Sequence, residues 1–322
     1  KKNFIEDYKN KTKIKYKDLP KIIHCLSREL ENQGFKKNCN IVLAIQDSWA
    51  KIILYFCFLH LKCKVFTIDY DNIHENDLTF IKKFKPNFFF LEPLLLDDKN
   101  FSKVITDKKN VFITNLNKNV QNNFKNINFE EILSKIKSIK KPTLNFQVNF
   151  EYLLINSSGT SGKYKVIKHS FKNLVKASNV IIEKHNIRNI RLLSVFSMSY
   201  MAGILNTIFI SFFSQGTIII KEKFNPFLAV NFWNEVKKYK INFLWLAPSM
   251  VEMLLKLDRV KDSSEIVKRV RWIFTATSKL EDQTYDDFKK KYKKSLLQTY
   301  GLSELLFVSS NQNEKKSNST GK

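Results

Sequence analysis

The residues best suited to bind an anion lie in one stretch, Asn156 to Lys165, with the sequence NSSGTSGKYK. Two glycines three positions apart let the backbone come close to an anion, so that its N–H groups can point at phosphate oxygens. Hydroxyl side chains and lysines add hydrogen-bond donors and positive charge. The stretch therefore predicts a phosphate-binding loop, which consists of Ser157, Ser158, Gly159, Thr160, Ser161, Gly162, Lys163 and Lys165.

The scarcity of glycine strengthens this interpretation. The chain has 7 glycines in 322 residues, against about 7% in an average protein, and two of them fall in this loop. Composition alone leaves open a flexible Ser/Gly surface turn. A Walker A loop does not fit, because GxxxxGK[ST] would need glycine at Ser157, Ser or Thr at Tyr164, and a helix that starts at the lysine.

The residues on both sides of the loop predict a strand, a loop and a strand. The apolar run Tyr152 to Ile155 precedes the loop, and the chain resumes through Lys165, Val166 and Ile167. A helix follows only later, with Ser170 as its N-cap. Its apolar residues recur at helical spacing, at Phe171, Leu174, Val175, Ile181 and Ile182.

Two further segments carry groups that suit a nucleotide. Tyr300 to Glu304 offers a flat ring for a base, the hydroxyl of Ser303, and a carboxylate at Glu304 that suits Mg²⁺. Ala276 to Leu280 follows another apolar run. Since ligands bind beyond the carboxyl ends of parallel strands, we expect both segments to converge with the phosphate loop. A buried aromatic at Tyr300 and a solvated charge at Glu304 remain the open alternative.

The elements that must position these segments alternate between strands and helices in both halves of the chain. The pattern predicts an α/β fold with layered, mostly parallel sheets and helices on both faces. The stretch Lys140 to Asn149, with Pro142, is the best candidate linker. We therefore expect a first α/β subdomain over residues 1–149 and a second over 150–322, which would carry the phosphate loop and TYGLSE.

Composition excludes several classes of protein. A hydrophobic content of 43% excludes a wholly disordered chain, and the formal charge of +25 comes from scattered lysines without a nucleic-acid recognition motif. The uncharged stretch Leu192 to Ile220 is long enough to span a bilayer, but its polar side chains and the turn at Gln215-Gly216 favour a buried helix and a core strand. The four cysteines make no C-x-x-C pair and suit reduced core residues of a cytoplasmic protein.

Taken in order, the motifs resemble the adenylate-forming superfamily, which includes acyl-CoA synthetases, carrier-protein ligases, luciferases and adenylation domains. SSGTSGKYK is similar to its signature [ST]SG[ST]TGxPK, TYGLSE to its YGxTE element, and TATSKL takes the place of its GGAPL loop. Weaker similarities lie in DSWAKIILYFCFLHLKCKVFTID and YKINFLWLAPSM. This chain departs from the pattern at Tyr164 (usually proline), at Val166 (usually glycine), and at Thr277 and Ser278 (usually Gly and Ala).

The resemblance implies an ATP site. Ser157 to Lys165 would hold the β- and γ-phosphates, Ser303 the α-phosphate, and Ser157 and Glu304 the Mg²⁺. Lys165, Ser303 and Glu304 would act in the reaction. The nucleotide would further contact Thr277, Ser278, Lys279, Thr299, Tyr300 and Gly301, and an acyl pocket would be lined by Phe196, Tyr200 and Gly203, where many members carry a histidine.

The implied activity is ATP-dependent conversion of a carboxylic acid to an acyl-adenylate, for transfer to CoA or to a phosphopantetheine carrier protein. The segment FSMSY has no aspartate that could pair with the ammonium group of an amino acid. This favours a carboxylic acid whose remaining part is uncharged. The family's ribose-binding aspartate, hinge and small C-terminal domain are not matched, so we expect a truncated large domain of a ligase, whose C-terminal part is either absent from this chain or supplied by a separate polypeptide. The alternative is an inactive relative that only binds a nucleotide or an acyl ligand.

Overall fold

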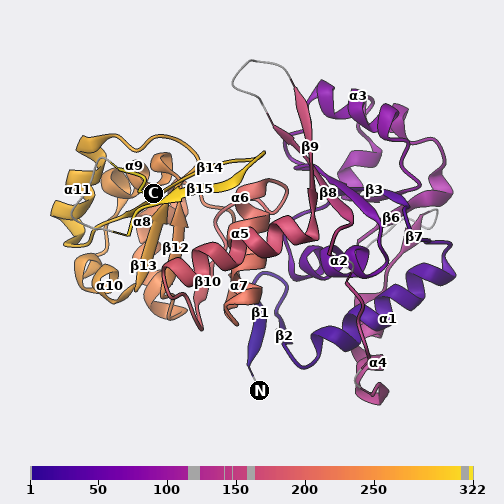
Figure 1. Ribbon diagram of the computed structural model, residues 1–322, viewed down its shortest axis with the longest axis horizontal. Coiled ribbons are helices and arrows are strands. Elements are labelled where there is room, and N and C mark those ends of the chain that lie inside the picture. The colour runs from indigo at the N-terminus through magenta and orange to yellow at the C-terminus, as the bar shows by residue number, and fades with distance from the viewer. Residues whose placement is uncertain are drawn as a thin grey trace. The chain divides into compact units, whose positions relative to one another are not determined.

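The computed structural model describes residues 2–114, 124–140, 142–146, 148–157, 164–312 and 319–321. The chain forms two compact units (Figure 1). Unit 1 comprises Lys1–Asn3 and Thr12–Leu174, and unit 2 comprises Phe4–Lys11 and Val175–Lys322. The chain therefore passes between the units twice near its beginning, and once more within the helix that follows the phosphate-loop hairpin.

The boundary between the units differs from the expected one between residues 149 and 150. Strand β8 (Glu151–Ser157) pairs in parallel with β4 (Lys64–Thr67), and β9 (Lys165–Ser170) pairs with β8, so both strands beside the predicted phosphate loop belong to unit 1. Strand β1 (Asn3–Asp7) pairs with β11 (Thr217–Ile220), which brings the beginning of the chain into unit 2. The apolar pattern located these strands but could not tell which strands they pair with.

Unit 1 is built on a sheet with the strand order β7-β6-β5-β3-β4-β8-β9, parallel except for the pair β8–β9. The other strands of this sheet are β3 (Asn40–Ala44), β5 (Phe88–Leu91), β6 (Val111–Ile113) and β7 (Lys125–Asn126), and the unit also contains β2 (Thr12–Lys15), which is not part of this sheet. Its helices are α1 (Leu19–Asn32), α2 (Trp49–His60), α3 (Glu75–Phe84) and α4 (Phe129–Lys135). Strands such as FFFL in β5 are buried throughout, as expected for a parallel sheet covered on both faces.

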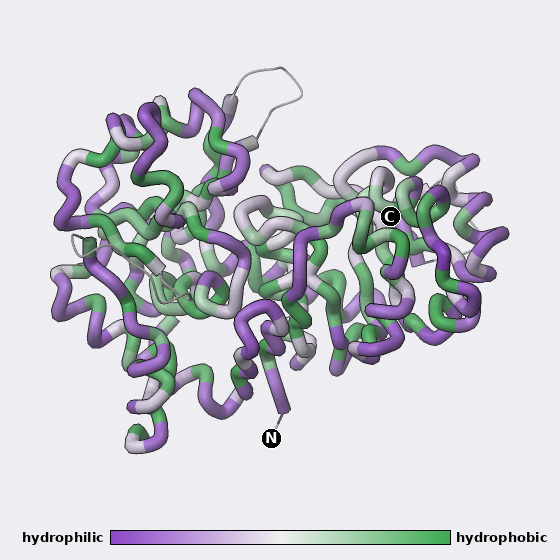
Figure 2. Tube along the Cα trace, turned by 180° about the vertical axis from the view of Figure 1, so that it is seen from behind, coloured by the Kyte–Doolittle hydropathy of each residue, from purple (hydrophilic) through white to green (hydrophobic). Residues whose placement is uncertain are grey.

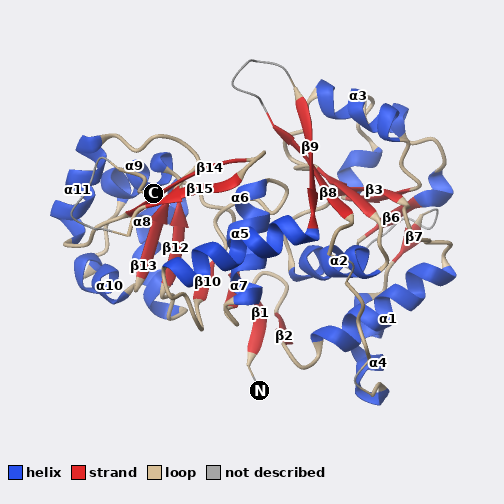
Figure 3. Ribbon diagram, viewed as in Figure 1, coloured by secondary structure: helices blue, strands red, loops and turns tan. Residues whose placement is uncertain are grey.

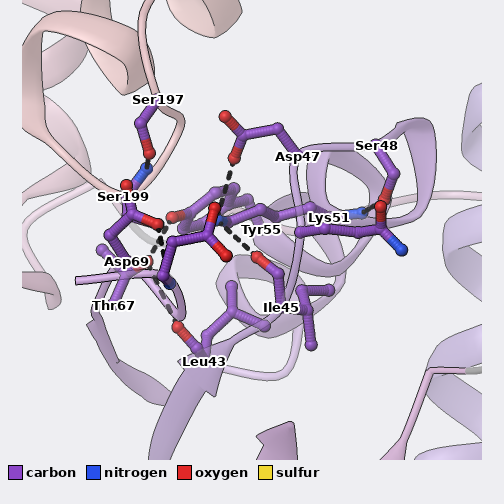
Figure 4. Close-up of polar contacts among 12 residues, drawn as sticks. Leu43, Ile45, Asp47, Ser48, Lys51, Tyr55, Thr67, Asp69, Ser197 and Ser199 are labelled. Carbon is purple, nitrogen blue, oxygen red and sulfur yellow. Dashed lines mark hydrogen bonds and ion pairs between the residues drawn. The ribbon is translucent and has the colours of Figure 1, made fainter. Parts of the chain in front are cut away.

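Helix α2 is enclosed along nearly its whole length because it is apolar on all sides. It begins after Ser48, whose side chain accepts a hydrogen bond of 3.3 Å from the backbone N–H of Lys51. The side chain of Lys51 is 0% exposed. Its Nζ donates to the carbonyl oxygen of Ile45 at 2.9 Å and to Oδ1 of Asp47 at 3.0 Å (Figure 4). A charged pair thus lies at the beginning of an apolar helix.

A second buried polar contact lies one turn further along α2. The hydroxyl of Tyr55 donates to Oγ1 of Thr67 at 2.7 Å, and that hydroxyl donates to the carbonyl oxygen of Leu43 at 3.4 Å (Figure 4). These bonds join the helix to the ends of β3 and β4. Buried polar groups are tolerated when they find such partners.

Unit 2 is built on a sheet with the order β15-β14-β13-β12-β10-β11-β1, which β2 extends beyond β1. Its remaining strands are β10 (Arg191–Leu193), β12 (Phe243–Leu246), β13 (Trp272–Thr275), β14 (Leu297–Leu302) and β15 (Leu306–Ser310). Its helices are α5 (Phe171–Lys184), which begins in unit 1, α6 (Met201–Gly203), a π-helical turn (Ile204–Phe209), α7 (Ile210–Phe213), α8 (Pro226–Lys238), α9 (Pro248–Leu257), α10 (Ser263–Arg269) and α11 (Asp282–Tyr292). In the order β1-β11-β10-β12-β13-β14, each strand is parallel to its neighbour. Among the pairs described for unit 2, only β14–β15 is antiparallel.

Helices cover both faces of the unit 2 sheet (Figure 3). On one face, residues of α8, α9, α10 and α11 pack against Leu244, Leu246 and Ile273. On the other, Ile181 of α5 and Ile210 of α7 pack against the alternate strand residues, which include Phe243 and Trp245. Hydropathy follows this layering, with hydrophobic strands and hydrophilic stretches on the outer helices (Figure 2). The predicted α/β fold with mostly parallel sheets is confirmed.

The uncharged stretch Leu192 to Ile220 is divided among β10, α6, the π-helical turn, α7 and β11. Within the described ranges, no helix is both long and apolar enough to cross a membrane. The buried helix and core strand expected from the turn at Gln215-Gly216 are therefore confirmed.

The four cysteines are free thiols. Cys57 and Cys63 are buried, as expected for core residues, whereas Cys25 and Cys39 are only half-buried. Cys39 precedes β3 and Cys63 precedes the neighbouring strand β4, so the parallel register brings the two cysteines together. The hydrogen bond from the Cys63 thiol lowers the pKa of Cys39 to about 6. The sequence spacing gave no sign of this pair.

His185, at the end of α5, makes unit 2 sensitive to acid. Its Nε2 lies 2.6 Å from Oγ of Ser310, and its ring packs edge-on against Phe274. Burial, with a smaller contribution from Lys184, lowers the pKa of His185 to about 4 from an ordinary 6.5. Between these two values the unfolded chain takes up a proton that the folded protein does not. Stability therefore falls as the pH drops from 6.5 towards 4.

We expect this effect to remove about 1 to 2 kcal/mol between pH 7 and pH 4.5, after discounting the full shift for the partial exposure of the ring. Urea unfolding of the wild type and of His185→Gln at both pH values measures it. Because carboxylates titrate in both proteins, the quantity to compare is the difference between their pH dependences. Equal pH dependences would contradict the assignment to His185.

Candidate functional site

The predicted phosphate loop joins the antiparallel strands β8 and β9 of unit 1. The two strands pair up to Asn156↔Val166 and Ser157↔Lys165. Lys165 is exposed on β9. Residues 158–163, which are Ser158, Gly159, Thr160, Ser161, Gly162 and Lys163, lie outside the described residues, as does the side chain of Ser157. The two strands that we predicted on either side of the loop are therefore confirmed.

The described ends of the loop are held by one carboxylate. Oδ1 of Asp77, in the first turn of α3, accepts a hydrogen bond from Nδ2 of Asn156 at 2.7 Å and another from the hydroxyl of Tyr164 at 2.8 Å. Its Oδ2 accepts from the backbone N–H of His74 at 2.9 Å. Asp77 is 0% exposed. Burial, reinforced by Asp77, holds the pKa of Tyr164 far above its ordinary value, so the phenol stays protonated and donates.

Sequence reasoning missed Asp77. Its partners lie 79 and 87 positions further along the chain, and no local pattern links them. The only local signal is the H-x-x-D sequence at the beginning of α3, which is typical of an acidic side chain that caps a helix N-terminus.

In unit 2, the segment Ala276 to Leu280 leaves the carboxyl end of β13. Thr277, Ser278 and Lys279 are exposed there, and Lys279 forms an exposed ion pair of 3.6 Å with Glu281. Thr277 has φ +83°, a conformation that favours glycine and is strained for a β-branched residue. The family usually has glycine at this position. This chain has threonine there, but its backbone keeps the conformation that suits glycine.

Thr277→Gly should relieve this strain. Strain of this kind costs about 1 to 3 kcal/mol, whereas glycine loses about 0.5 to 1 kcal/mol through the entropy of the unfolded chain. We expect a net gain of about 1 kcal/mol in the free energy of unfolding by urea. Ser278→Gly, next to it at an ordinary φ, is the matched control and should lose stability. Loss of stability in both variants would contradict the strain.

The TYGLSE segment is a strand and a turn rather than the expected loop. Strand β14 continues through Thr299 to Leu302 and pairs with β15, with a shift of register between Tyr300 and Gly301. A Cβ on Gly301 would lie 2.3 Å from the carbonyl oxygen of Leu306. This glycine is therefore required by the close approach of β15, a reason that the sequence did not reveal.

The side chains of this segment differ in exposure. Thr299 is buried, and its Oγ1 donates to the carbonyl oxygen of Thr275 at 3.3 Å. The ring of Tyr300 is 46% exposed. Ser303 is half-buried and Glu304 is exposed in the turn between β14 and β15. A partly exposed tyrosine and an exposed carboxylate are both accessible to a ligand.

Unit 2 brings three of the predicted segments to one edge. β13 and β14 are neighbouring parallel strands, paired through Phe274↔Leu297 and Thr275↔Gln298. The same sheet carries β10 in parallel, and Phe196 follows its carboxyl end. The nucleotide segments and the acyl-pocket segment therefore leave the same edge, as expected for a ligand site of a parallel sheet. Their convergence with the phosphate loop of unit 1 remains a prediction.

The predicted acyl-pocket residues have mixed surroundings. Phe196 is half-buried and packs against both hydrophobic clusters of unit 2. Tyr200 is half-buried and directly precedes α6. Gly203 is buried, and a Cβ there would lie 2.0 Å from the carbonyl oxygen of Ser197. The π-helical turn that begins at Ile204 is a type of irregularity often found at functional sites.

The described residues contain no group of three or more His, Cys, Asp or Glu side chains that could hold a metal ion. Mg²⁺ commonly uses one or two carboxylates together with the phosphates of its substrate. The exposed carboxylate of Glu304 offers the hard oxygen that such an ion needs.

A model of the AMP-binding enzyme family matches residues 2–322. The chain belongs to the AMP-binding enzyme family. It is 25% identical over 153 residues to acyl-CoA synthetase ALT10 of Alternaria alternata, which covers 47% of this chain and 26% of that protein. It is 22% identical over 153 residues to oxalate–CoA ligase of Saccharomyces cerevisiae, with 47% of this chain and 27% of that protein covered. These alignments span about a quarter of the two relatives.

Solved structures of adenylate-forming enzymes share the fold of this chain. The anthranilate CoA ligase AuaEII, in complex with anthranoyl-AMP, superposes with a TM-score of 0.84 at 14% identity, over 100% of this chain and 61% of that one. ATP-bound MatB from Rhodopseudomonas palustris gives 0.77 at 16% identity, over 96% and 58%. The resemblance to the large N-terminal core of adenylate-forming enzymes is confirmed.

Proposed function

We propose that this chain binds ATP and Mg²⁺ and activates a carboxylic acid as an acyl-adenylate, as the large part of an acid–thiol ligase. The observation that carries the proposal is the match of the AMP-binding family over residues 2–322. The positions of Thr277 to Lys279 and Tyr300 to Glu304 at the ends of neighbouring parallel strands support it.

In the proposed reaction, a carboxylate oxygen attacks the α-phosphorus of ATP and pyrophosphate leaves. Negative charge grows on the phosphoryl oxygens, so donors and cations must be in place beforehand. Ser157 to Lys165 would bind the β- and γ-phosphates through backbone N–H groups, hydroxyls and lysines, and Ser303 would donate to the α-phosphate. When bound by Ser157 and Glu304, Mg²⁺ would neutralise charge on the phosphate oxygens.

The base of ATP would stack on Tyr300. Almost half of its ring is exposed, and it follows the buried Thr299, which fixes β14 to β13. Thr277, Ser278 and Lys279 leave the adjacent strand and would contact the edge of the base, with the backbone of Gly301 close by. An exposed aromatic ring on a fixed strand suits stacking of a base.

The acid would enter beside Phe196, Tyr200 and Gly203. The segment Phe196 to Tyr200 contains no carboxylate, so a buried ammonium would lack a counter-charge and an uncharged acid is favoured. Transfer of the acyl group to CoA or to a phosphopantetheine carrier protein would need residues that the family places outside the matched core, on a separate polypeptide or on a longer chain.

A second candidate is a relative that binds a nucleotide or an acyl ligand without turnover. The departures at Tyr164 and Thr277 favour it, since both lie in segments that would contact ATP. The strained φ of Thr277 is the specific structural observation.

ATP–pyrophosphate exchange with a panel of carboxylic acids tests the proposal, with and without any polypeptide encoded beside this one. We expect exchange with an uncharged acid, and a loss of about 100-fold or more in Lys165→Ala and Glu304→Gln, because each removes a charge that would act on the phosphates. Lys168→Ala, an exposed lysine on the same strand β9, is the control and should keep the wild-type rate. Binding of ATP without exchange for any acid would leave the second candidate.

A further inference from the structure

The described ends of the phosphate-loop hairpin meet on one buried oxygen atom. Asn156 comes directly before Ser157, and Tyr164 directly follows Lys163. Both donate to Oδ1 of Asp77, at 2.7 Å and 2.8 Å. Asp77 stands on α3, far from both residues in sequence, and is 0% exposed. One carboxylate therefore ties together the two points where the chain enters and leaves the predicted loop.

These bonds belong to the strong class. A carboxylate acceptor shortens and strengthens a hydrogen bond from a neutral donor, and burial removes the competition from water. The phenol of Tyr164 keeps its proton, because burial and Asp77 both raise its pKa. The backbone N–H of His74 satisfies the second carboxylate oxygen, so the side chain of Asp77 is fixed on both sides.

The position of Tyr164 makes such an anchor useful. Proline, the residue usual here in the resembling motif, fixes φ by its ring, whereas tyrosine does not restrict its backbone in this way. The hydrogen bond to Asp77 instead fixes the residue from its side chain. Asn156 is fixed in the same way on the other strand, so Asp77 adds a side-chain tie at the two loop ends, beside the backbone pairs Asn156↔Val166 and Ser157↔Lys165.

We propose that Asp77 is a positioning residue, which fixes Asn156 and Tyr164, the two described ends of the predicted phosphate loop, and thereby supports binding of the β- and γ-phosphates of a nucleoside triphosphate. The inference rests on the proposed function, because it assumes that the loop binds a triphosphate. Asp77 itself touches no phosphate in this scheme. Its effect should therefore appear as a preference for ATP over AMP, since AMP lacks the phosphates that the loop would hold.

The experiment measures binding of ATP and of AMP by calorimetry, in the presence of Mg²⁺, for the wild type, Tyr164→Phe and Asp77→Asn. Tyr164→Phe removes one hydroxyl and leaves the cap of α3 in place. We expect it to weaken ATP binding about tenfold, the effect of one hydrogen bond to a charged group, and Asp77→Asn to weaken it at least as much. Binding of AMP should change less than twofold in both variants.

Tyr152→Phe is the matched control. It makes the same chemical change on β8, where the buried hydroxyl of Tyr152 donates to the carbonyl oxygen of Tyr55 at 2.6 Å, away from the loop. A merely structural role of tyrosine hydroxyls would lower thermal stability in Tyr152→Phe and Tyr164→Phe alike. Only Tyr164→Phe should change the ratio of ATP to AMP affinity.

Limited trypsin digestion supplies a readout that needs no ligand. Loss of the anchor should speed cleavage after Lys163 and Lys165 in Tyr164→Phe and Asp77→Asn, and not in Tyr152→Phe. Unchanged ATP to AMP ratios together with unchanged cleavage would overturn the positioning role and leave the proposed function standing. A wild-type chain that binds neither nucleotide would overturn both.

Discussion

Replacement of Lys51 by alanine is expected to cost about 3 to 5 kcal/mol of folding stability, the range measured when one partner of a buried ion pair is removed. The Lys51 side chain is 0% exposed and that of Asp47 is 14% exposed, with 3.0 Å between Nζ and Oδ1. The variant would leave Asp47 without this cation, remove a donor from the carbonyl oxygen of Ile45, and open a cavity in α2. Urea denaturation followed by circular dichroism measures the change.

The chain supplies a matched control in α4. Lys135 pairs with Glu131 at the same i,i+4 spacing, with 2.6 Å between the charged atoms, but both side chains are more than half exposed. Exposed pairs of this kind contribute about 0.3 to 0.5 kcal/mol, so Lys135→Ala should hardly change the midpoint. Equal losses of folding stability in Lys51→Ala and Lys135→Ala would contradict the idea that burial makes the Lys51 pair more important for stability.

Gly203→Ala is expected to lose about 3 kcal/mol, although alanine is favoured over glycine by about 1 kcal/mol in an ordinary helix. The added Cβ would lie 2.0 Å from the carbonyl oxygen of Ser197 and 2.9 Å from the backbone nitrogen of Met198. Backbone atoms cannot rotate out of the way as a flexible side chain can. The segment Ser197 to Met198 must therefore move, at the upper end of the cost of overpacking.

The neighbouring position gives the control for this substitution. Ala202→Gly exchanges the same two residue types in the opposite direction, one residue earlier in α6, and should cost only about 1 kcal/mol. Thermal unfolding of both variants separates the clash from helix propensity. If Gly203→Ala were as stable as the wild type or more so, the close contact with Ser197 would be refuted.

The sequence predicted those parts of the fold that depend on local patterns. The apolar periodicity located α5, and Ser170 was correctly predicted to cap its beginning, where its Oγ accepts from the backbone N–H of Asn173 at 3.3 Å. The two strands of the phosphate-loop hairpin were also correct. In each case the signal and the structure lie within a few residues of each other.

Features that depend on distant partners could not be predicted in this way. Strand β15 was missed, and Gly301 was assigned to a ligand loop, because nothing near Tyr300 indicates that Leu306 would pack so closely. Asp77, on helix α3, was missed because its partners lie far along the chain, with Asn156 on β8 and Tyr164 directly before β9. Asp77 could have been proposed only by noting that Tyr164 replaces the usual proline and brings a hydroxyl group that needs a partner. Acidic residues in the first turn of a helix would then be the candidates for that partner.

The pairing of Ile5 with Ile218 has a consequence for how the polypeptide reaches its final form. The first strand leaves the ribosome long before its neighbour β11 exists, so the strand edge that pairs with β11 must wait, unpaired, while the intervening residues of unit 1 are made. A fragment that began at Val175 would lack β1 and would expose the unpaired edge of strand β11 to solvent. Such exposed strand edges are a common starting point for aggregation. Expression of unit 2 alone should therefore succeed only when residues 3–7 are supplied with it.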